Sequence, residues 1–358
     1  MEGQLKKPPS ASDAEMSYSC RSFCRNAWGQ VMSPKNVVVT GANGFIGQHL
    51  CRKLVESGRD VTACIRERAN VSAFGDLSGS MRICRIPSLG PGEKLSEILR
   101  KADAVVHLAG RAHVMHETAG NPLSEFRKVN VCFTESLASM AVQAGVKRFI
   151  YLSSIKVNGE ATEGRAFFAD DQPNYCDYYG QSKWEAEESL RQIGTGTEME
   201  WVVVRPPLVY GPEVRGNFLA LLKCIARGIP LPVGSLHNSR SLVSVYNLSD
   251  FLCHLLDHPG AANDCFIVSD GEDISTSDLV RHMATALHCS ARIVNCPKAV
   301  LRLAGTLLRK DAAVQRLCSS LVVDREKAKK CLGWSAPKTL DWGLVRTAEW
   351  FLGRKQGE

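Results

Sequence analysis

The sequence predicts an α/β protein in which a doubly wound parallel sheet, with helices on both faces, stands beside a smaller C-terminal lobe. Short apolar segments rich in β-branched residues alternate with amphipathic helical patterns from residue 36 to about residue 205. A glycine-rich turn joins the first apolar segment to the first helical pattern. After about residue 206 the alternation ends, and Gly and Pro interrupt shorter segments.

Within the alternating region, strands are predicted near residues 36–40, 60–65, 82–86, 103–109, 147–153 and 200–205, with helices between most of them. One long helix starts at Asn121-Pro122 and stops at Gly145, because Pro is favoured in the first turn of a helix and Gly just after its end. A further helix is expected near residues 177–193.

Beyond residue 206 a helix is expected near 217–227, followed by shorter helices near 247–257, 275–288, 297–309, 324–331 and 339–353. The predicted organisation is a disordered extension (1–34), a dinucleotide-binding domain that carries the catalytic residues (35–205) and a smaller substrate-binding lobe (206–358). The extension is polar and lacks a sustained apolar period, so Met32 is a candidate natural start.

The composition favours a protein that handles small molecules. Its 44 basic and 37 acidic residues give a net charge of +7 without a long basic run, which suits a phosphorylated metabolite better than a nucleic acid. No run of 18 apolar residues and no apolar signal core are present, so we expect no membrane insertion and a cytoplasmic location. The 14 cysteines are scattered without a Cys-x-x-Cys pair, which indicates reduced core thiols and no metal site.

The glycine turn has the residues that a dinucleotide site needs. Val37, Val38, Val39 and Thr40 form a β-branched run that passes directly into Gly41, Gly44 and Gly47. Gly41 permits the turn, Gly44 lets a pyrophosphate approach the backbone, and Gly47 lets the helix pack on its strand. The free amides at the start of that helix face the anion, so a Rossmann-type dinucleotide site is predicted here.

A candidate acid–base pair lies further along the chain. Tyr179 and Lys183 are four residues apart on the predicted helix and therefore share one face. An ammonium next to a phenol stabilises the phenolate and makes it a usable acid or base. Ser153 and Ser154 end the fifth strand at the edge where the cofactor is expected, and a hydroxyl there can hold a substrate oxygen.

With these motifs the chain resembles the extended short-chain dehydrogenase/reductases, the family of NAD-dependent epimerases, dehydratases and reductases of nucleotide sugars. The resemblance covers roughly residues 35–353, and seven signatures carry it in order: Thr-Gly-Ala-Asn-Gly-Phe-Ile-Gly (40–47), Asp-Ala-Val-Val-His-Leu-Ala-Gly (103–110), Ser153-Ser154, Tyr179-x-x-x-Lys183, Arg-Pro-Pro-Leu-Val-Tyr-Gly-Pro (205–212), Arg-Ser-Leu-Val-Ser-Val-Tyr-Asn-Leu-Ser-Asp (240–250) and Leu-Gly-Trp (332–334).

The resemblance implies roles for individual residues. It makes Ser154, Tyr179 and Lys183 the catalytic hydroxyl, the acid–base group and the lysine that also holds the nicotinamide ribose. It implies that Ser154, Asn217 and Arg240 bind the substrate, the last two at its diphosphate. Cofactor contacts are implied for Gly41, Gly44, Phe45, Ile46, Gly47, Arg66, His107, Ala109, Tyr179 and Lys183.

Three positions depart from the pattern of many epimerases. The second strand ends in Cys64-Ile65-Arg66-Glu67-Arg68 where an acidic residue usually binds the adenosine ribose. Arg accommodates a 2′-phosphate, so NADP is predicted as the preferred cofactor, with NAD as the alternative. The other departures are Leu208 in place of Asn, and Ser88 where Asp usually contacts adenine.

Two reactions fit the same three catalytic residues. The stretches His-Leu-Ala-Gly-Arg-Ala-His-Val-Met (107–115) and Ser-Ser-Ile-Lys-Val-Asn-Gly-Glu (153–160) resemble reductases of UDP-4-keto-6-deoxy-N-acetylhexosamines in bacterial surface-polysaccharide synthesis, so an oxidoreductase acting at sugar C4 is predicted first. The alternative is a UDP-glucose or UDP-N-acetylglucosamine 4-epimerase that retains NAD, and a remote third is a dinucleotide sensor without catalysis. A homodimer is implied, with pairing through the helices near 121–144 and 177–193.

Overall fold

The computed structural model describes residues 33–86, 92–112, 121–307 and 311–355. Val31–Glu358 form one compact unit. The predicted extension falls mostly on residues 1–32, and Ser88 and the end of the 107–115 stretch fall in two of the gaps, so these predictions lie outside the described residues.

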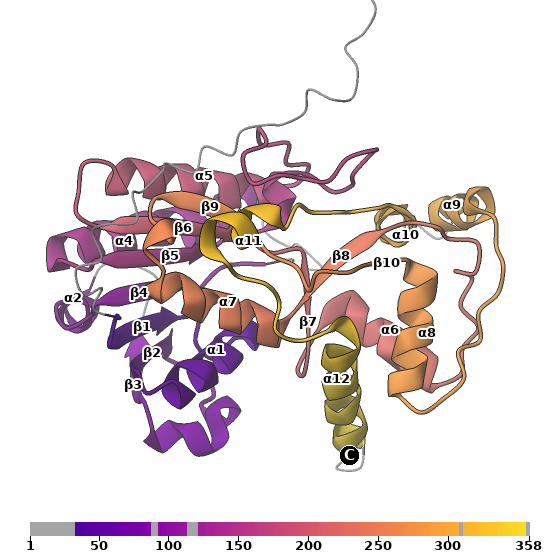
Figure 1. Cartoon of the computed structure of the whole chain (residues 1–358), viewed down its shortest axis with the longest axis horizontal. Helices are drawn as coiled ribbons and strands as arrows, with labels where there is room; N and C mark the ends of the chain where they lie inside the picture. Colours follow the sequence, from indigo (N-terminus) through magenta and orange to yellow (C-terminus); the bar gives the residue numbers. More distant parts are fainter. Residues whose placement is uncertain (1–32, 87–91, 113–120, 308–310, 356–358) are drawn as a thin grey trace, which may run out of the picture. The chain divides into compact units, whose positions relative to one another are not determined.

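A parallel sheet of seven strands forms the larger part of the fold, in the order β3-β2-β1-β4-β5-β6-β9 (Figure 1). The strands are β1 (Asn36–Thr40), β2 (Asp60–Arg66), β3 (Arg82–Ile86), β4 (Ala104–His107), β5 (Arg148–Leu152), β6 (Glu200–Arg205) and β9 (Asp264–Ile267). All six predicted strands are confirmed. Their buried, β-branched side chains suit a sheet that is covered on both faces.

Two apolar clusters cover the two faces of this sheet. One joins Val37 and Val39 to α1 (Phe45–Glu56) and α7 (Val245–Asp257). The other joins Val38 to α4 (Phe133–Ala144) and α5 (Tyr178–Gly194). Alternate residues of β1 thus face opposite layers, as the period of a strand requires.

The long helix predicted from Asn121-Pro122 to Gly145 is present but interrupted. It consists of α3 (Pro122–Arg127), a π-helical turn η2 (Lys128–Cys132) and α4, and it ends at Gly145 with φ of 79°. The Asn121 side chain accepts a hydrogen bond from the Ser124 amide and caps the first turn. The π turn was not predicted, although such turns are frequent at functional sites.

Short connecting elements complete the sheet region. They are η1 (Ser72–Gly79), α2 (Glu93–Leu99), η3 (Ile155–Val157) and η4 (Pro259–Ala261).

A third apolar cluster gathers residues from Tyr210 to Phe351 beside the large sheet (Figure 1). Its elements are the small sheet β10-β8-β7, made of β7 (Leu208–Tyr210), β8 (Arg240–Ser244) and β10 (Asp273–Ile274), with α6 (Gly216–Ala226), α8 (Thr276–Ala286), α9 (Lys298–Leu307), α10 (Asp311–Cys318) and α12 (Leu340–Lys355). The helix α11 (Glu326–Leu332) packs against β9. The domain boundary at residue 205 stays a prediction. Two elements that follow it in sequence belong with the large sheet: β9 is its last strand, and α7 packs on one of its faces.

Candidate active site

The turn between β1 and α1 is packed so tightly that only glycine fits at two of its positions. A Cβ on Gly41, whose φ is 66°, would lie 2.7 Å from the Ala109 amide nitrogen. A Cβ on Gly47 would lie 2.4 Å from the Gly41 carbonyl oxygen. Gly44 precedes the helix and supplies no side-chain cap. The first amides of α1 are therefore available for an anion, which is what a dinucleotide pyrophosphate requires.

Several predicted cofactor residues lie at this same edge of the sheet. Phe45 and Ile46 form the first turn of α1, and Arg66 is exposed at the carboxyl end of β2. The Ala109 amide follows β4 and donates to the Thr40 hydroxyl at 3.3 Å. The positions of these residues are consistent with a dinucleotide lying across the ends of β1, β2 and β4, and their contacts with it remain predictions.

His107 differs from its neighbours because its ring lies inside the protein. It is fully buried between the hydroxyl of Thr40, 2.6 Å from Nδ1, and the hydroxyl of Thr134, 3.0 Å from Nε2. Burial is the main cause that lowers its pKa to about 3, and the charge of Lys183 acts in the same direction. The ring is therefore neutral and bridges β1 to α4, and its predicted role at the cofactor stays untested.

The three predicted catalytic residues come together where β5 meets α5. Ser154 follows β5, and its hydroxyl interacts with the phenol of Tyr179 and favours the ionised form of that phenol. Lys183 lies one turn after Tyr179, is 4% exposed, and donates from Nζ to the Leu152 carbonyl at 2.8 Å. Its ammonium also lies over the Tyr151 ring, 4.5 Å from the centroid.

Burial acts in opposite directions on the two titrating groups. It raises the pKa of Tyr179 to about 12, while the hydrogen bond from Ser154 opposes the increase. It lowers the pKa of Lys183 to about 7, and the charge of Glu187 opposes the decrease. Both shifts have the sign expected when a charged form loses its water.

Asn130 is a member of the site that sequence reasoning missed. It is fully buried in the π turn η2, and its Nδ2 donates to Ser182 Oγ at 2.9 Å and to the Arg111 carbonyl at 3.1 Å. A Cβ on Gly110 would lie 3.2 Å from Asn130 Oδ1 and 3.3 Å from Lys183 Nζ. The sequence does contain one signal for it. Asn130 lies between two valines inside a predicted helix, although Asn is a poor helix former.

A second missed feature joins the segment of Ser154 to the segment of Tyr179. Lys156 Nζ lies 2.5 Å from a carboxylate oxygen of Asp177 and 2.5 Å from one of Glu160. The other oxygen of Asp177 accepts the Gly180 amide at 2.7 Å and caps α5. The same carboxylate therefore starts the catalytic helix and pairs with the lysine that follows Ser154.

Ser153, unlike Ser154, points into a buried ion pair. Its hydroxyl donates to Glu187, which also accepts from the guanidinium of Arg205 at 2.6 and 2.9 Å. Arg205 is 1% exposed, and its pKa is raised because the charges around it, Glu187 among them, outweigh the effect of its burial. The arginine of the 205–212 signature thus fastens β6 to α5.

Arg240 lies near a cleft rather than on an open surface. Its Nη1 donates to the carbonyls of Arg316 at 2.8 Å and Ser319 at 3.1 Å, at the end of α10. Burial is the main cause that lowers its pKa, and the charge of Glu160 opposes the decrease. A cavity of about 340 Å³ opens here, lined by Lys156, Glu160, Cys176, Asp177, Gln315, Arg316 and Ser319.

Ser154, Tyr179, Lys183 and Arg240 do not line this cavity themselves, but neighbours of each group do. Lys156 and Asp177 lie two residues from Ser154 and Tyr179, whereas Arg316 and Ser319 are the residues that Arg240 contacts. Asn217 is exposed in the first turn of α6 and does not line the cavity. The cavity is the candidate substrate cleft.

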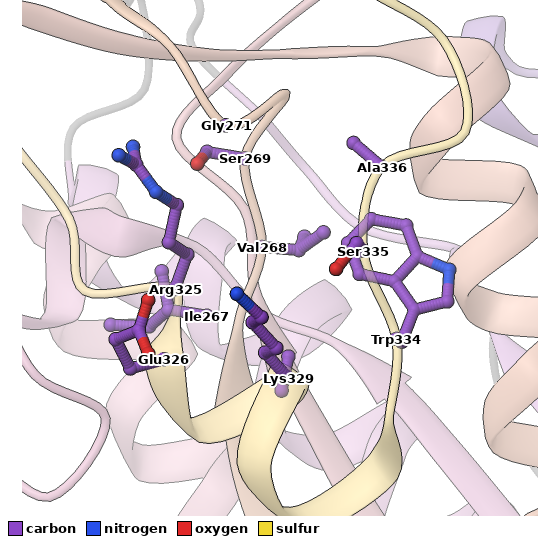
Figure 2. Close-up of a pocket in the computed structure, with 11 residues that line it drawn as sticks. Ile267, Val268, Ser269, Gly271, Arg325, Glu326, Lys329, Trp334, Ser335 and Ala336 are labelled. Atoms are coloured by element: carbon purple, nitrogen blue, oxygen red, sulfur yellow. The ribbon is translucent and has the colours of Figure 1, made fainter.

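A second cavity, of about 140 Å³, lies at the carboxyl end of β9, and none of the predicted site residues lines it (Figure 2). Trp334 of the 332–334 signature lines this cavity beside Ser335, opposite the chain that follows β9. Its indole nitrogen donates to Asp250 at 3.0 Å, and its ring contacts Phe251. This signature residue therefore holds α11 against α7.

Comparison with known proteins decides the family. Residues 37–268 match the NAD dependent epimerase/dehydratase family. The chain belongs to this family. A UDP-glucose 4-epimerase of Vibrio cholerae is 41% identical over 318 residues, which cover 87% of this chain and 93% of that protein.

Two further proteins extend the comparison. The N-acetyl-alpha-D-glucosaminyl-diphospho-ditrans,octacis-undecaprenol 4-epimerase of Escherichia coli O157:H7 is 27% identical, over 75% of this chain and 78% of that protein. The crystal structure of UDP-glucuronic acid 4-epimerase from Bacillus cereus, in complex with NAD, has a TM-score of 0.73 at 21% identity and covers 89% of this chain and 99% of its own.

These comparisons make the protein an NAD-dependent enzyme of the nucleotide-sugar epimerase/dehydratase type. They favour the 4-epimerase alternative over the 4-keto-sugar reductase that the sequence stretches predicted first. No helix among the described residues is long and apolar enough to cross a membrane.

Proposed function

We propose that this protein is a UDP-sugar 4-epimerase that retains NAD through its catalytic cycle. The observation that carries the proposal is the 41% identity with a UDP-glucose 4-epimerase along 87% of the chain. The interacting Ser154 and Tyr179, with their neighbours Lys156 and Asp177 lining a cleft large enough for a sugar, support it.

In this proposal Tyr179 takes the proton of the sugar C4 hydroxyl and later returns it. Ser154 donates a hydrogen bond to the C4 oxygen and holds it against the phenol. Lys183 lies on the same helix face and supplies the positive charge that favours the phenolate. NAD, which the glycine turn of Gly41, Gly44 and Gly47 would hold, would supply the hydride exchange at C4.

The glycine turn is the proposed site for the dinucleotide, and the cleft is the proposed site for the substrate diphosphate. Gly41, Gly44 and Gly47 form the turn proposed to hold the dinucleotide, and a side chain at Gly41 or Gly47 would collide with backbone. Arg240 and the end of α10 offer cationic groups for the substrate diphosphate, which a guanidinium binds well. Asn217 at the start of α6 is the remaining proposed diphosphate contact.

The test asks whether the hydride that leaves C4 returns to C4 of the sugar. Purified protein is incubated without added cofactor, with UDP-glucose or UDP-N-acetylglucosamine that carries deuterium at C4. The proposal predicts interconversion of the C4 epimers by NMR, with the deuterium retained at C4, and release of NAD on denaturation. Tyr179→Phe serves as the inactive control.

The same preparation is given UDP-4-keto-6-deoxy-N-acetylglucosamine and NADPH. Consumption of one NADPH per sugar, without epimerisation of either UDP-sugar, would contradict the proposal and restore the reductase prediction. In that case Arg66→Asp should weaken NADPH binding relative to NADH, because a charge-assisted phosphate contact contributes about 1.5–3 kcal/mol.

A sugar joined through a diphosphate to a polyprenol is a second candidate substrate. It is the kind of substrate for which the Escherichia coli relative is named. The observation in favour of it is an exposed apolar helix, α9, packed against the helix that lines the cleft.

A further inference from the structure

The helix α9 carries an apolar face that no described part of the chain covers. Val300, Leu303 and Leu307 are 52%, 63% and 76% exposed. Their spacing of three and four residues puts them on one side of the helix. Leu301, on the other side, is 7% exposed and anchors α9 in the apolar cluster of the C-terminal elements.

Two segments that precede α9 in the sequence carry further exposed apolar side chains. Leu231 and Ile293 form a bridge, and the Leu231 amide donates to the Arg292 carbonyl at 2.7 Å. Ile229 and Val294 are 42% and 49% exposed in these segments. We call Val300, Leu303 and Leu307 the α9 surface.

The sequence of α9 and of the segment before it is basic. From residue 292 to residue 302 it contains three basic residues, Arg292, Lys298 and Arg302, and no acidic one. Arg292 and Lys298 are exposed, as is Arg227, which closely precedes Ile229. Exposed apolar side chains bordered by cations suit an anionic, partly apolar partner.

We propose that the α9 surface docks the protein on an anionic phospholipid bilayer. A helix with one apolar side and neighbouring Lys and Arg lies in the plane of the interface, with its apolar side among the acyl chains and its cations at the headgroups. Anionic lipid supplies both the negative charge and the apolar layer that this surface lacks.

This docking would bring the catalytic cleft close to the membrane. Helix α9 packs against α10, and the two lie together at the side of the molecule remote from the β3 edge of the large sheet (Figure 1). Gln315 and Arg316 of α10 line the cleft, and Arg240 contacts the end of the same helix. The inference concerns the location of catalysis and does not depend on which sugar is converted.

The test measures co-sedimentation of the full chain with vesicles. Vesicles of phosphatidylcholine mixed with phosphatidylglycerol should bind the protein, and vesicles of phosphatidylcholine alone should bind it less. Binding should weaken as salt is raised, because screening reduces the attraction of exposed charges. Leu303→Gln combined with Leu307→Gln should lower the partition coefficient about tenfold or more.

Val345→Gln is the matched control, because Val345 is 43% exposed on α12, away from the α9 surface. It should leave vesicle binding unchanged. Thermal unfolding should be similar for all variants, since the substituted side chains are exposed. Equal binding by the double variant and the control would overturn the proposal.

Self-association is the other use of such a surface. If light scattering showed an assembly that dissociates in the Leu303→Gln/Leu307→Gln variant, while neither vesicle type bound the protein, the α9 surface would be a contact between copies and the proposal would be wrong.

Discussion

Tyr179 and Lys183 share one face of α5, and burial shifts their pKa values in opposite directions. With the Tyr179 pKa raised to about 12 and the Lys183 pKa lowered to about 7, the phenol is protonated and the ammonium is only partly charged at neutral pH. Further positive charge in the site is therefore needed before the phenol can act as a base, and an oxidised nicotinamide supplies it when bound.

Replacing Tyr179 by Phe keeps the ring and removes the acidic hydroxyl. We expect kcat to fall by about 10²–10⁴ while NAD affinity stays within a few-fold. Tyr178→Phe is the control, because Tyr178 is adjacent in sequence but 51% exposed. Equal activity of the two variants would mean that another acid acts, and Cys176, which lines the cleft, would be tested next.

Lys183 should lower the stability of the fold below neutral pH. Its pKa is depressed from 10.5 to about 7, so the unfolded chain binds more protons than the folded one between these values, and the free energy of unfolding rises with pH there. Lys183→Met, although inactive, should therefore be more stable than the parent at pH 6, by roughly 2–5 kcal/mol.

Denaturant unfolding at several pH values checks this expectation. The advantage of the Met variant should shrink as pH rises from about 7 toward about 10. A difference that does not change with pH would show that the burial of charge at Lys183 is not its cause.

At the scale of elements, α1 can pack closely on β1 because Gly47 has no side chain. Gly47→Ala would put a Cβ 2.4 Å from the Gly41 carbonyl oxygen, so α1 must move away and distort the turn. We expect a loss of about 1–3 kcal/mol of stability and loss of NAD retention.

Gly353→Ala in α12 is the control for that substitution. No atom lies within 4 Å of a Cβ at Gly353, and its φ is not positive. Ala should therefore stabilise this helix, by about 0.5–1 kcal/mol, and leave NAD bound. Thermal unfolding and the absorbance of the released cofactor measure both effects, and NAD retention by the Gly47 variant would argue against the pyrophosphate site.

At the scale of the whole molecule, residues 1–31 should be dispensable. They lack the periodic apolar pattern that packing on a domain requires. A chain that starts at Met32 should keep the epimerase activity and the Tm of the full chain, as measured by NMR and by thermal unfolding. A large loss of either would show that the extension packs on the domain.

Assembly is the second prediction at this scale. We expect a homodimer in which α4 and α5 pair with the same helices of a second copy, because an isologous four-helix contact covers both pairs of helices at once. Static light scattering at micromolar concentration should give twice the chain mass of 39.2 kDa. A monomeric mass would contradict the predicted pairing.

The sequence alone determined the features whose signal is local. The β-branched runs predicted β1 to β6, and Gly41, Gly44 and Gly47 marked the turn because each acts through its own backbone. The four-residue spacing of Tyr179 and Lys183 was sufficient to place them on one helix face.

Only the tertiary structure decided the features that join distant parts of the chain. Asn130 meets Ser182 across 52 residues, and β9 pairs with β6 although about 60 residues separate them. Arg240 reaches the end of α10, 76 residues away. Such contacts depend on the packing of the layers, which no short stretch of sequence encodes, because burial and hydrogen-bond partners exist only after the chain has folded.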